Sequence, residues 1–240
     1  MITYPFISQR TTKLQSKLSS PVKTIVKEQS LRNYERSNMN KDLLILTGLI
    51  LIIVNYQIQV EGFAGWVLMY TFLFSIIPIL IALLLKIRFK EIGLSLESWK
   101  KFLPVSLVIL FLSSPFIVYA STREDFSNYY PVWNPGLPQL NFLITESIVL
   151  LLMFNTEFFF RGYLLFSLEE KFGNRAIFLQ SIPYSLMHIG KLPIEVPYSF
   201  LAGLVFGYIA LKYRSVFPGL LVHWSGSVFL DILIIASKPA

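Results

Sequence analysis

Seven long apolar segments dominate this chain from residue 43 onward and leave few kinds of structure open to it. They lie near residues 43–59, 64–85, 102–121, 139–160, 176–190, 196–212 and 216–236. A stretch of about 20 apolar residues is long enough to cross a bilayer as a helix. The segments lack the alternation of apolar and polar residues that marks the strands of a membrane β-barrel. The sequence therefore predicts an all-α fold, a polytopic membrane helix bundle of about seven transmembrane helices.

Composition supports a membrane protein and excludes several kinds of site. Hydrophobic residues make up 54% of the chain and charged residues only 15%. So few polar side chains cannot cover the surface of a soluble domain of this length. Because the sequence contains no cysteine, disulfides, thiolate–zinc sites and cysteine nucleophiles are excluded together.

The basic residues are distributed as in a multi-pass protein whose N-terminus is cytoplasmic. With that orientation, 18 of the 21 Lys and Arg residues fall in the N-terminal tail and the cytoplasmic connections, as the positive-inside rule requires. The net charge of +7 thus reflects topology and gives no argument for a nucleic-acid partner. We expect an integral membrane protein surrounded by the lipid bilayer, with a bacterial cell membrane as its location.

We divide the chain into three parts. Residues 1–41 are polar and basic and are predicted to form a flexible cytoplasmic tail. Residues 42–138 hold the N-terminal transmembrane helices and residues 139–240 the transmembrane core, so that 42–240 form one bundle. The fifth apolar segment is short and contains Pro183, and the stretch 161–173 either continues the fourth span or lies along the membrane surface.

Ionisable side chains within the apolar segments mark a candidate site. The chain has only two histidines, His188 and His223, and both lie in predicted spans; Glu157 and Arg161 lie in another. Because charged groups are costly in hydrocarbon, each of these residues is a functional candidate. Glu157 and Arg161 are four residues apart and share a helix face. Their pair either neutralises two buried charges or holds the carboxylate toward a wet cavity.

Further polar residues recur at helical spacing around these four. Glu146 lies eleven residues before Glu157, about 20° away around an ideal helix, and so lines the same face. Ser227 and Asp231 follow His223 by four and eight residues and can orient the ring or share its protons. Glu195 follows His188 by seven residues, at the mouth of the next span.

These residues suit more than one chemistry. Glu157, His188 and His223 form a sensible zinc ligand set that leaves a position open for water, so zinc is the one candidate cofactor. Ser225 or Ser227 could serve as a nucleophile beside His223, but no glycine-framed elbow is present. A transporter would show repeat symmetry between its halves, whereas the ionisable residues crowd into the second half.

Three sequence motifs resemble those of the CPBP intramembrane proteases, the family of CAAX prenyl endopeptidases and bacteriocin-processing and immunity proteins. The motifs are "EFFFRGYLL", "YSLMH" and "HWSGS", and the resemblance covers residues 139–236. It implies an all-α bundle in which Glu157 is the second glutamate of the first motif and Arg161 its arginine. Tyr184 and His188 would then form the second motif, and His223 would open the third.

The resemblance implies an endopeptidase that hydrolyses a peptide bond of a membrane-associated protein or peptide, using water activated by glutamate and histidine. Two departures bear on this activity: Thr156 replaces the first glutamate, and Ser227 replaces an asparagine that would help bind the oxyanion. A threonine hydroxyl is not a general base of normal strength near neutral pH, whereas a serine hydroxyl still donates a hydrogen bond to an oxyanion.

We therefore predict that Glu157, together with either Glu146 or Glu195, supplies the acid function. Straight spans would put Glu157 and Glu195 near opposite membrane faces, so Glu195 can join only if the fifth span is short or bent. The alternative is a catalytically inactive CPBP-like scaffold or immunity protein that binds a peptide or membrane partner. The sequence points to no particular substrate or oligomeric state.

Overall fold

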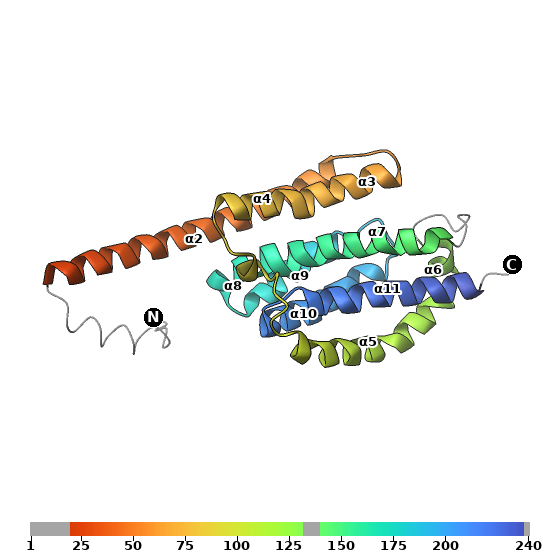
Figure 1. The fold of residues 1–240 in the computed structure, drawn as a ribbon. Helices are drawn as coiled ribbons and strands as arrows, with labels where there is room; N and C mark the ends of the chain where they lie inside the picture. Colours follow the sequence, from red (N-terminus) through yellow and green to blue (C-terminus); the bar gives the residue numbers. More distant parts are fainter. Residues whose placement is uncertain (1–19, 132–139, 238–240) are drawn as a thin grey trace. The chain divides into compact units, whose positions relative to one another are not determined.

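The computed structural model describes residues 20–131 and 140–237, and every regular element in these ranges is a helix (Figure 1). The chain divides into two compact units, residues 1–42 and residues 43–240. In the first unit, the predicted flexible tail is helical from Ser20 onward, as the beginning of α2 (Ser20–Gln57), while its residues before Ser20 lie outside the described ranges. Pro21 stands in the first turn, where its fixed φ fits a helix. The division predicted between residues 138 and 139 also lies outside the described ranges.

The second unit is a helix bundle, which confirms the predicted fold class. After α2 come α3 (Gly62–Thr71), η1 (Phe72–Ile76), α4 (Ile77–Leu84), η2 (Phe89–Ile92), α5 (Trp99–Ser121), α6 (Glu124–Tyr129), α7 (Leu140–Glu157), η3 (Phe158–Leu164), α8 (Leu165–Phe172), α9 (Arg175–Leu186), α10 (Glu195–Tyr213) and α11 (Phe217–Ser237). Six helical stretches in the described residues are long and apolar enough to cross a membrane: Met39–Gln57, Gly62–Leu84, Trp99–Ser121, Phe142–Phe172, Glu195–Tyr213 and Phe217–Ser237.

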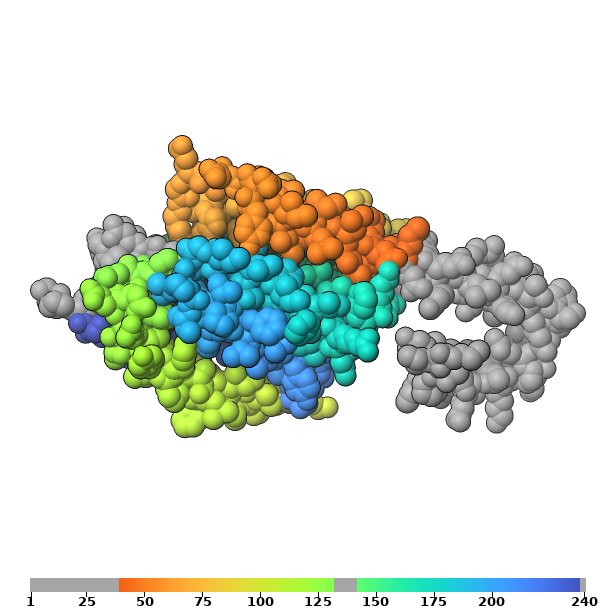
Figure 2. All heavy atoms as spheres, turned by 180° about the vertical axis from the view of Figure 1, so that it is seen from behind, coloured from red at the N-terminus to blue at the C-terminus, as the bar shows by residue number. Residues whose placement is uncertain are grey.

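The fifth apolar segment forms a helix too short to be among these six. Helix α9 has 12 residues and ends at Leu186, before His188, and a connection without regular helix leads to Glu195. Glycines allow α9 and α10 to approach closely: a Cβ at Gly203 would lie 2.8 Å from Oγ of Ser181, and one at Gly207 would lie 2.9 Å from Nε2 of Gln180. Small residues four apart commonly serve this purpose between membrane helices. Figure 2 shows α9 and α10 side by side on one face of the unit.

The fourth span is one long helical run through α7, η3 and α8, so the stretch 161–173 continues this span, the first of the two predicted alternatives. Its middle part, η3, is a π-helix, a feature often found near functional sites. Side-chain hydrogen bonds join α7 to the second span: Asn155 donates to Thr71 at 2.8 Å and accepts from Ser75 at 2.6 Å. These buried bonds fix the rotation of α7 and hence the directions of its acidic side chains.

Candidate active site

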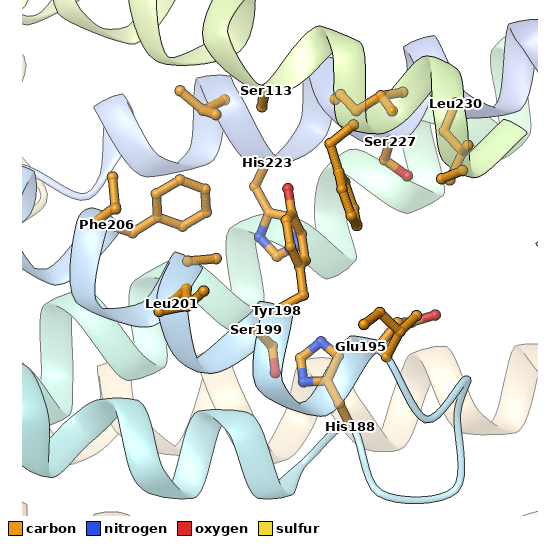
Figure 3. A pocket seen from close by; sticks show the side chains of 18 of the residues that line it. Ser113, His188, Glu195, Tyr198, Ser199, Leu201, Phe206, His223, Ser227 and Leu230 are labelled. Atoms are coloured by element: carbon orange, nitrogen blue, oxygen red, sulfur yellow. The ribbon is translucent and has the colours of Figure 1, made fainter.

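A cavity of about 340 Å³ lies among α5, α10, α11 and the connection from α9 to α10. Most of its wall is apolar and includes Ile109, Phe116, Ile117, Leu201, Ala202, Val205 and Leu230. Its polar lining includes both histidines of the chain, with Glu195, Ser227, Lys191 and Tyr130. Figure 3 shows His223 and Ser227 on one side and His188 and Glu195 on the other. The cavity therefore joins two imidazoles, a carboxylate and a hydroxyl in apolar surroundings.

The buried ion pair of Glu157 and Arg161 contacts His223 through the Glu157 carboxylate. Nδ1 of His223 lies 2.9 Å from Oε1 of Glu157, and Oε2 of Glu157 lies 3.4 Å from Nε of Arg161. Glu157 and Arg161 are fully buried and do not line the cavity. The predicted Glu157–Arg161 pair is thus present, but its carboxylate turns to His223 rather than into the cavity. With Nδ1 taken by the carboxylate, Nε2 is the His223 nitrogen left for other partners.

Tyr184 connects Arg161 with His188. The Arg161 guanidinium lies 3.8 Å from the centroid of the Tyr184 ring, in a cation–π contact. The backbone carbonyl of Tyr184 accepts a hydrogen bond from Nδ1 of His188 at 3.0 Å. Burial, followed by the nearby charge of Lys191, lowers the pKa of His188 to about 3. The ring is therefore neutral near neutral pH, and since Nδ1 carries its proton, Nε2 is free to accept one.

Glu195 is the one acidic residue among the described residues that line the cavity. It is the first residue of α10 and is buried, and its Oε1 accepts a hydrogen bond of 2.7 Å from the Tyr130 hydroxyl. The short α9 places His188 and Glu195 at the same end of the helix pair. Glu195 was predicted to join the histidines only if the fifth span is short or bent, and α9 is short.

The remaining predicted acids lie elsewhere. Glu146 on α7 meets Asp231 on α11, and all four carboxylate oxygens are buried without a hydrogen-bond donor among the described residues. Both acidic residues of α7 thus face α11, as their helical spacing predicts. Asp231 was predicted to orient His223, but its contact is with Glu146, while Glu157 meets the ring.

The first position of the family's first motif also faces away from the cavity. The Thr156 hydroxyl donates to the backbone carbonyl of Leu152 at 2.9 Å and lies 3.0 Å from the hydroxyl of Tyr70 in α3. The hydrogen bonds that fix α7 also fix this orientation. Ser227, at the asparagine position of the third motif, does line the cavity.

The zinc site predicted at Glu157, His188 and His223 does not fit this geometry. In the ranges 20–131 and 140–237, no three His, Cys, Asp or Glu side chains are placed to hold one metal ion. The physical reason lies in their partners: Glu157 is engaged by Arg161 and Nδ1 of His223, and Nδ1 of His188 is engaged by a backbone carbonyl.

Several polar residues of the cavity were missed by the sequence reasoning, among them Tyr130 and Lys191. Tyr130 directly follows α6, and Lys191 lies in the connection between α9 and α10. Both lie outside the apolar segments, and although Lys191 follows His188 by three residues, no motif marks either one.

Comparison with known proteins shows which family this part of the chain is similar to. Residues 138–229 match the family model described as Type II CAAX prenyl endopeptidase Rce1-like. The match includes all three motifs, from Glu157 to Ser227. No curated protein and no solved structure matches the chain. The resemblance to the CPBP intramembrane proteases, inferred from the motifs and consistent with the helix bundle, is thus confirmed over residues 138–229.

Proposed function

We propose that the protein is an intramembrane endopeptidase in which Glu195, assisted by His188, activates water for hydrolysis of a membrane-associated protein or peptide. The observation that carries this proposal is the cavity, which gathers both histidines and a single carboxylate inside a membrane helix bundle. In this proposal the N-terminus faces the cytoplasm, as the distribution of basic residues predicts, and the membrane is that of a bacterial cell.

The reaction begins with a water molecule that donates hydrogen bonds to the Glu195 carboxylate and to Nε2 of His188. Glu195 takes a proton from this water as the water oxygen attacks the carbonyl carbon of the scissile amide. The new C–O bond converts the carbonyl oxygen into an oxyanion. When the intermediate collapses, the C–N bond breaks and the leaving amine takes the proton from Glu195.

The opposite wall stabilises the oxyanion. Ser227 offers a hydroxyl, and His223 offers Nε2–H when its ring carries both protons. Glu157 balances the charge of that ring through its contact with Nδ1, and Arg161 balances Glu157. Glu157 thus serves as the orienting partner of His223, and Glu195 serves as the base that Thr156 cannot be.

One observation favours the alternative function, an inactive CPBP-like scaffold or immunity protein that binds a peptide or membrane partner. Thr156 is engaged by Tyr70 and does not line the cavity, so the first motif contributes no carboxylate there. The cavity would then hold its partner without cleaving it.

The test is cleavage by the full chain in proteoliposomes. The probe is a quenched fluorescent peptide ending in a farnesylated CAAX sequence, chosen because the matching family is described by that substrate. We expect His188→Ala and Glu195→Gln to lower the rate by about 100-fold or more, the usual size for a lost general base. Glu61→Gln, at an exposed glutamate before α3, serves as the matched control. Wild-type rates in both site variants would contradict the proposal. A cellular effect that survives His188→Ala would favour the scaffold.

A further inference from the structure

Tyr130 makes a contact that no motif explains. It lies 65 residues before Glu195 in the sequence, yet its hydroxyl donates a hydrogen bond of 2.7 Å to Oε1 of that carboxylate. No other described residue donates a hydrogen bond to the Glu195 side chain. The contact therefore determines how the one acidic residue of the cavity lining is held.

The Tyr130 ring is itself held in place by its neighbours. It stacks on Phe126, with ring centroids 6.1 Å apart, and meets Tyr129 edge to face at 5.0 Å. Phe126 is buried and also lines the cavity. Helix α6 thus provides a fixed support for the hydroxyl.

The protonation state of Tyr130 suits a donor. Burial, followed by the neighbouring Glu195 carboxylate, raises its pKa well above the usual value of a tyrosine. The phenol therefore keeps its proton near neutral pH and can donate it in the hydrogen bond to the Glu195 carboxyl group. A hydrogen bond to an ionised group is roughly twice as strong as one between neutral groups.

We propose that Tyr130 is a positioning residue for Glu195 in the hydrolysis proposed above, on which this inference rests. By binding Oε1, it fixes the rotation of the carboxyl group and leaves Oε2 to receive the proton of the attacking water. Placing the base within about 3 Å of the water is the geometric requirement for its action. The tyrosine does not touch the reacting atoms and acts through Glu195 alone.

The experiment compares Tyr130→Phe, which removes only the hydroxyl, with Tyr129→Phe, which removes the hydroxyl of the neighbouring ring. With the farnesylated CAAX peptide in proteoliposomes, we expect Tyr130→Phe to lower kcat by roughly 10-fold, the size of one hydrogen bond to an ionised group, with KM unchanged. Tyr129→Phe should keep the wild-type kcat. In a Glu195→Gln background, Tyr130→Phe should cause no further loss, because the carboxylate through which it acts is gone.

A second measurement does not depend on cleavage. Infrared spectra of the wild type and of Glu195→Gln identify the carboxylate stretching band of Glu195 by its loss, and we expect Tyr130→Phe to shift that band. Tyr129→Phe should not shift it. An unshifted band overturns the proposal, even if the peptide is not a substrate.

The kinetic outcomes separate this inference from the proposed function. If Glu195→Gln is inactive while Tyr130→Phe retains the wild-type kcat, the role of Tyr130 is refuted and that of Glu195 stands. If Glu195→Gln cleaves at the wild-type rate, the proposed base is wrong, and the positioning role falls with it. A loss in Tyr130→Phe that is equally large in the Glu195→Gln background would show a structural defect and would refute the inference.

Discussion

The buried carboxylate of Glu157 lies close to the backbone of α11 at Gly219, and this packing gives a sharp test of how His223 is oriented. A Cβ at Gly219 would lie 2.6 Å from Oε2 of Glu157 and 3.4 Å from its Cδ. The carboxylate cannot swing aside freely, because it is fully buried between Arg161 and His223. Restoring an ordinary contact of at least 3.4 Å requires the carboxylate oxygen to retreat by about 0.8 Å. We therefore expect Gly219→Ala to weaken the bond to Nδ1 of His223.

The size of the effect follows from two opposing contributions. Loss of a hydrogen bond to a charged group costs about 1.5–3 kcal/mol. Alanine in place of glycine stabilises a helix by up to about 1 kcal/mol. The free energy of unfolding should fall by a net amount of about 1–2 kcal/mol. Cleavage should fall by roughly 10-fold or more, because the weakened bond also orients His223 in the transition state and each 1.36 kcal/mol of lost transition-state stabilisation is a factor of ten.

The matched control is Gly226→Ala on the same helix. A Cβ there would meet Cδ1 of Ile117 at 3.5 Å and Cδ1 of Leu110 at 3.9 Å, both ordinary contacts. This variant should be as stable as the wild type or slightly more stable. Thermal unfolding of the detergent-solubilised proteins and peptide cleavage in proteoliposomes measure both effects. If Gly219→Ala matches Gly226→Ala in unfolding temperature and matches the wild type in cleavage rate, the orientation of His223 does not depend on the packing of Glu157 against α11.

Two further predictions concern the buried charges. Arg161→Met leaves Glu157 without its cationic partner and should destabilise the protein by about 3–5 kcal/mol. In thermal unfolding, the double variant Glu157→Gln/Arg161→Met should recover part of this loss of stability, and failure to recover any would show that the unpaired charge is not the cause. Glu146→Gln gives Asp231 an amide donor in place of a second carboxyl group, so its unfolding temperature at pH 8 should equal or exceed that of the wild type, and a clear decrease would contradict this.

Hydropathy predicted the helical spans well because the bilayer fixes the length of a spanning helix. The periodicity of 3.6 also predicted that Glu146 and Glu157 share a face, and both do meet α11. The directions in which the acidic side chains point were harder to predict from the sequence than the helical spans. Whether a carboxylate on α7 enters the cavity depends on how α7 is rotated against its neighbours, and the buried bonds of Asn155 that set this rotation come from residues about 80 positions away in the sequence.

The entry of Glu195 into the cavity depends likewise on tertiary structure. Its position follows from where α9 stops, and α9 ends at Leu186 rather than at the limit of the apolar segment. Tyr130 could not be found from sequence at all, since its contact joins a loop residue to a helix 65 residues later. Local pattern thus identified the histidines and the resemblance to the family, while the position of Glu195 in the cavity depends on the packed structure.

The contact between Thr156 and Tyr70 determines what a longer side chain at position 156 would meet. A glutamate introduced at position 156 would stand where the threonine hydroxyl now meets Tyr70 in a buried interface, not in the cavity. Turning that carboxylate into the cavity would require changes in α3 and in the hydrogen bonds of Asn155 that fix α7. A single Thr156→Glu change would therefore bury a carboxylate beside Tyr70 and leave Glu195 as the one acidic residue among the described residues that line the cavity.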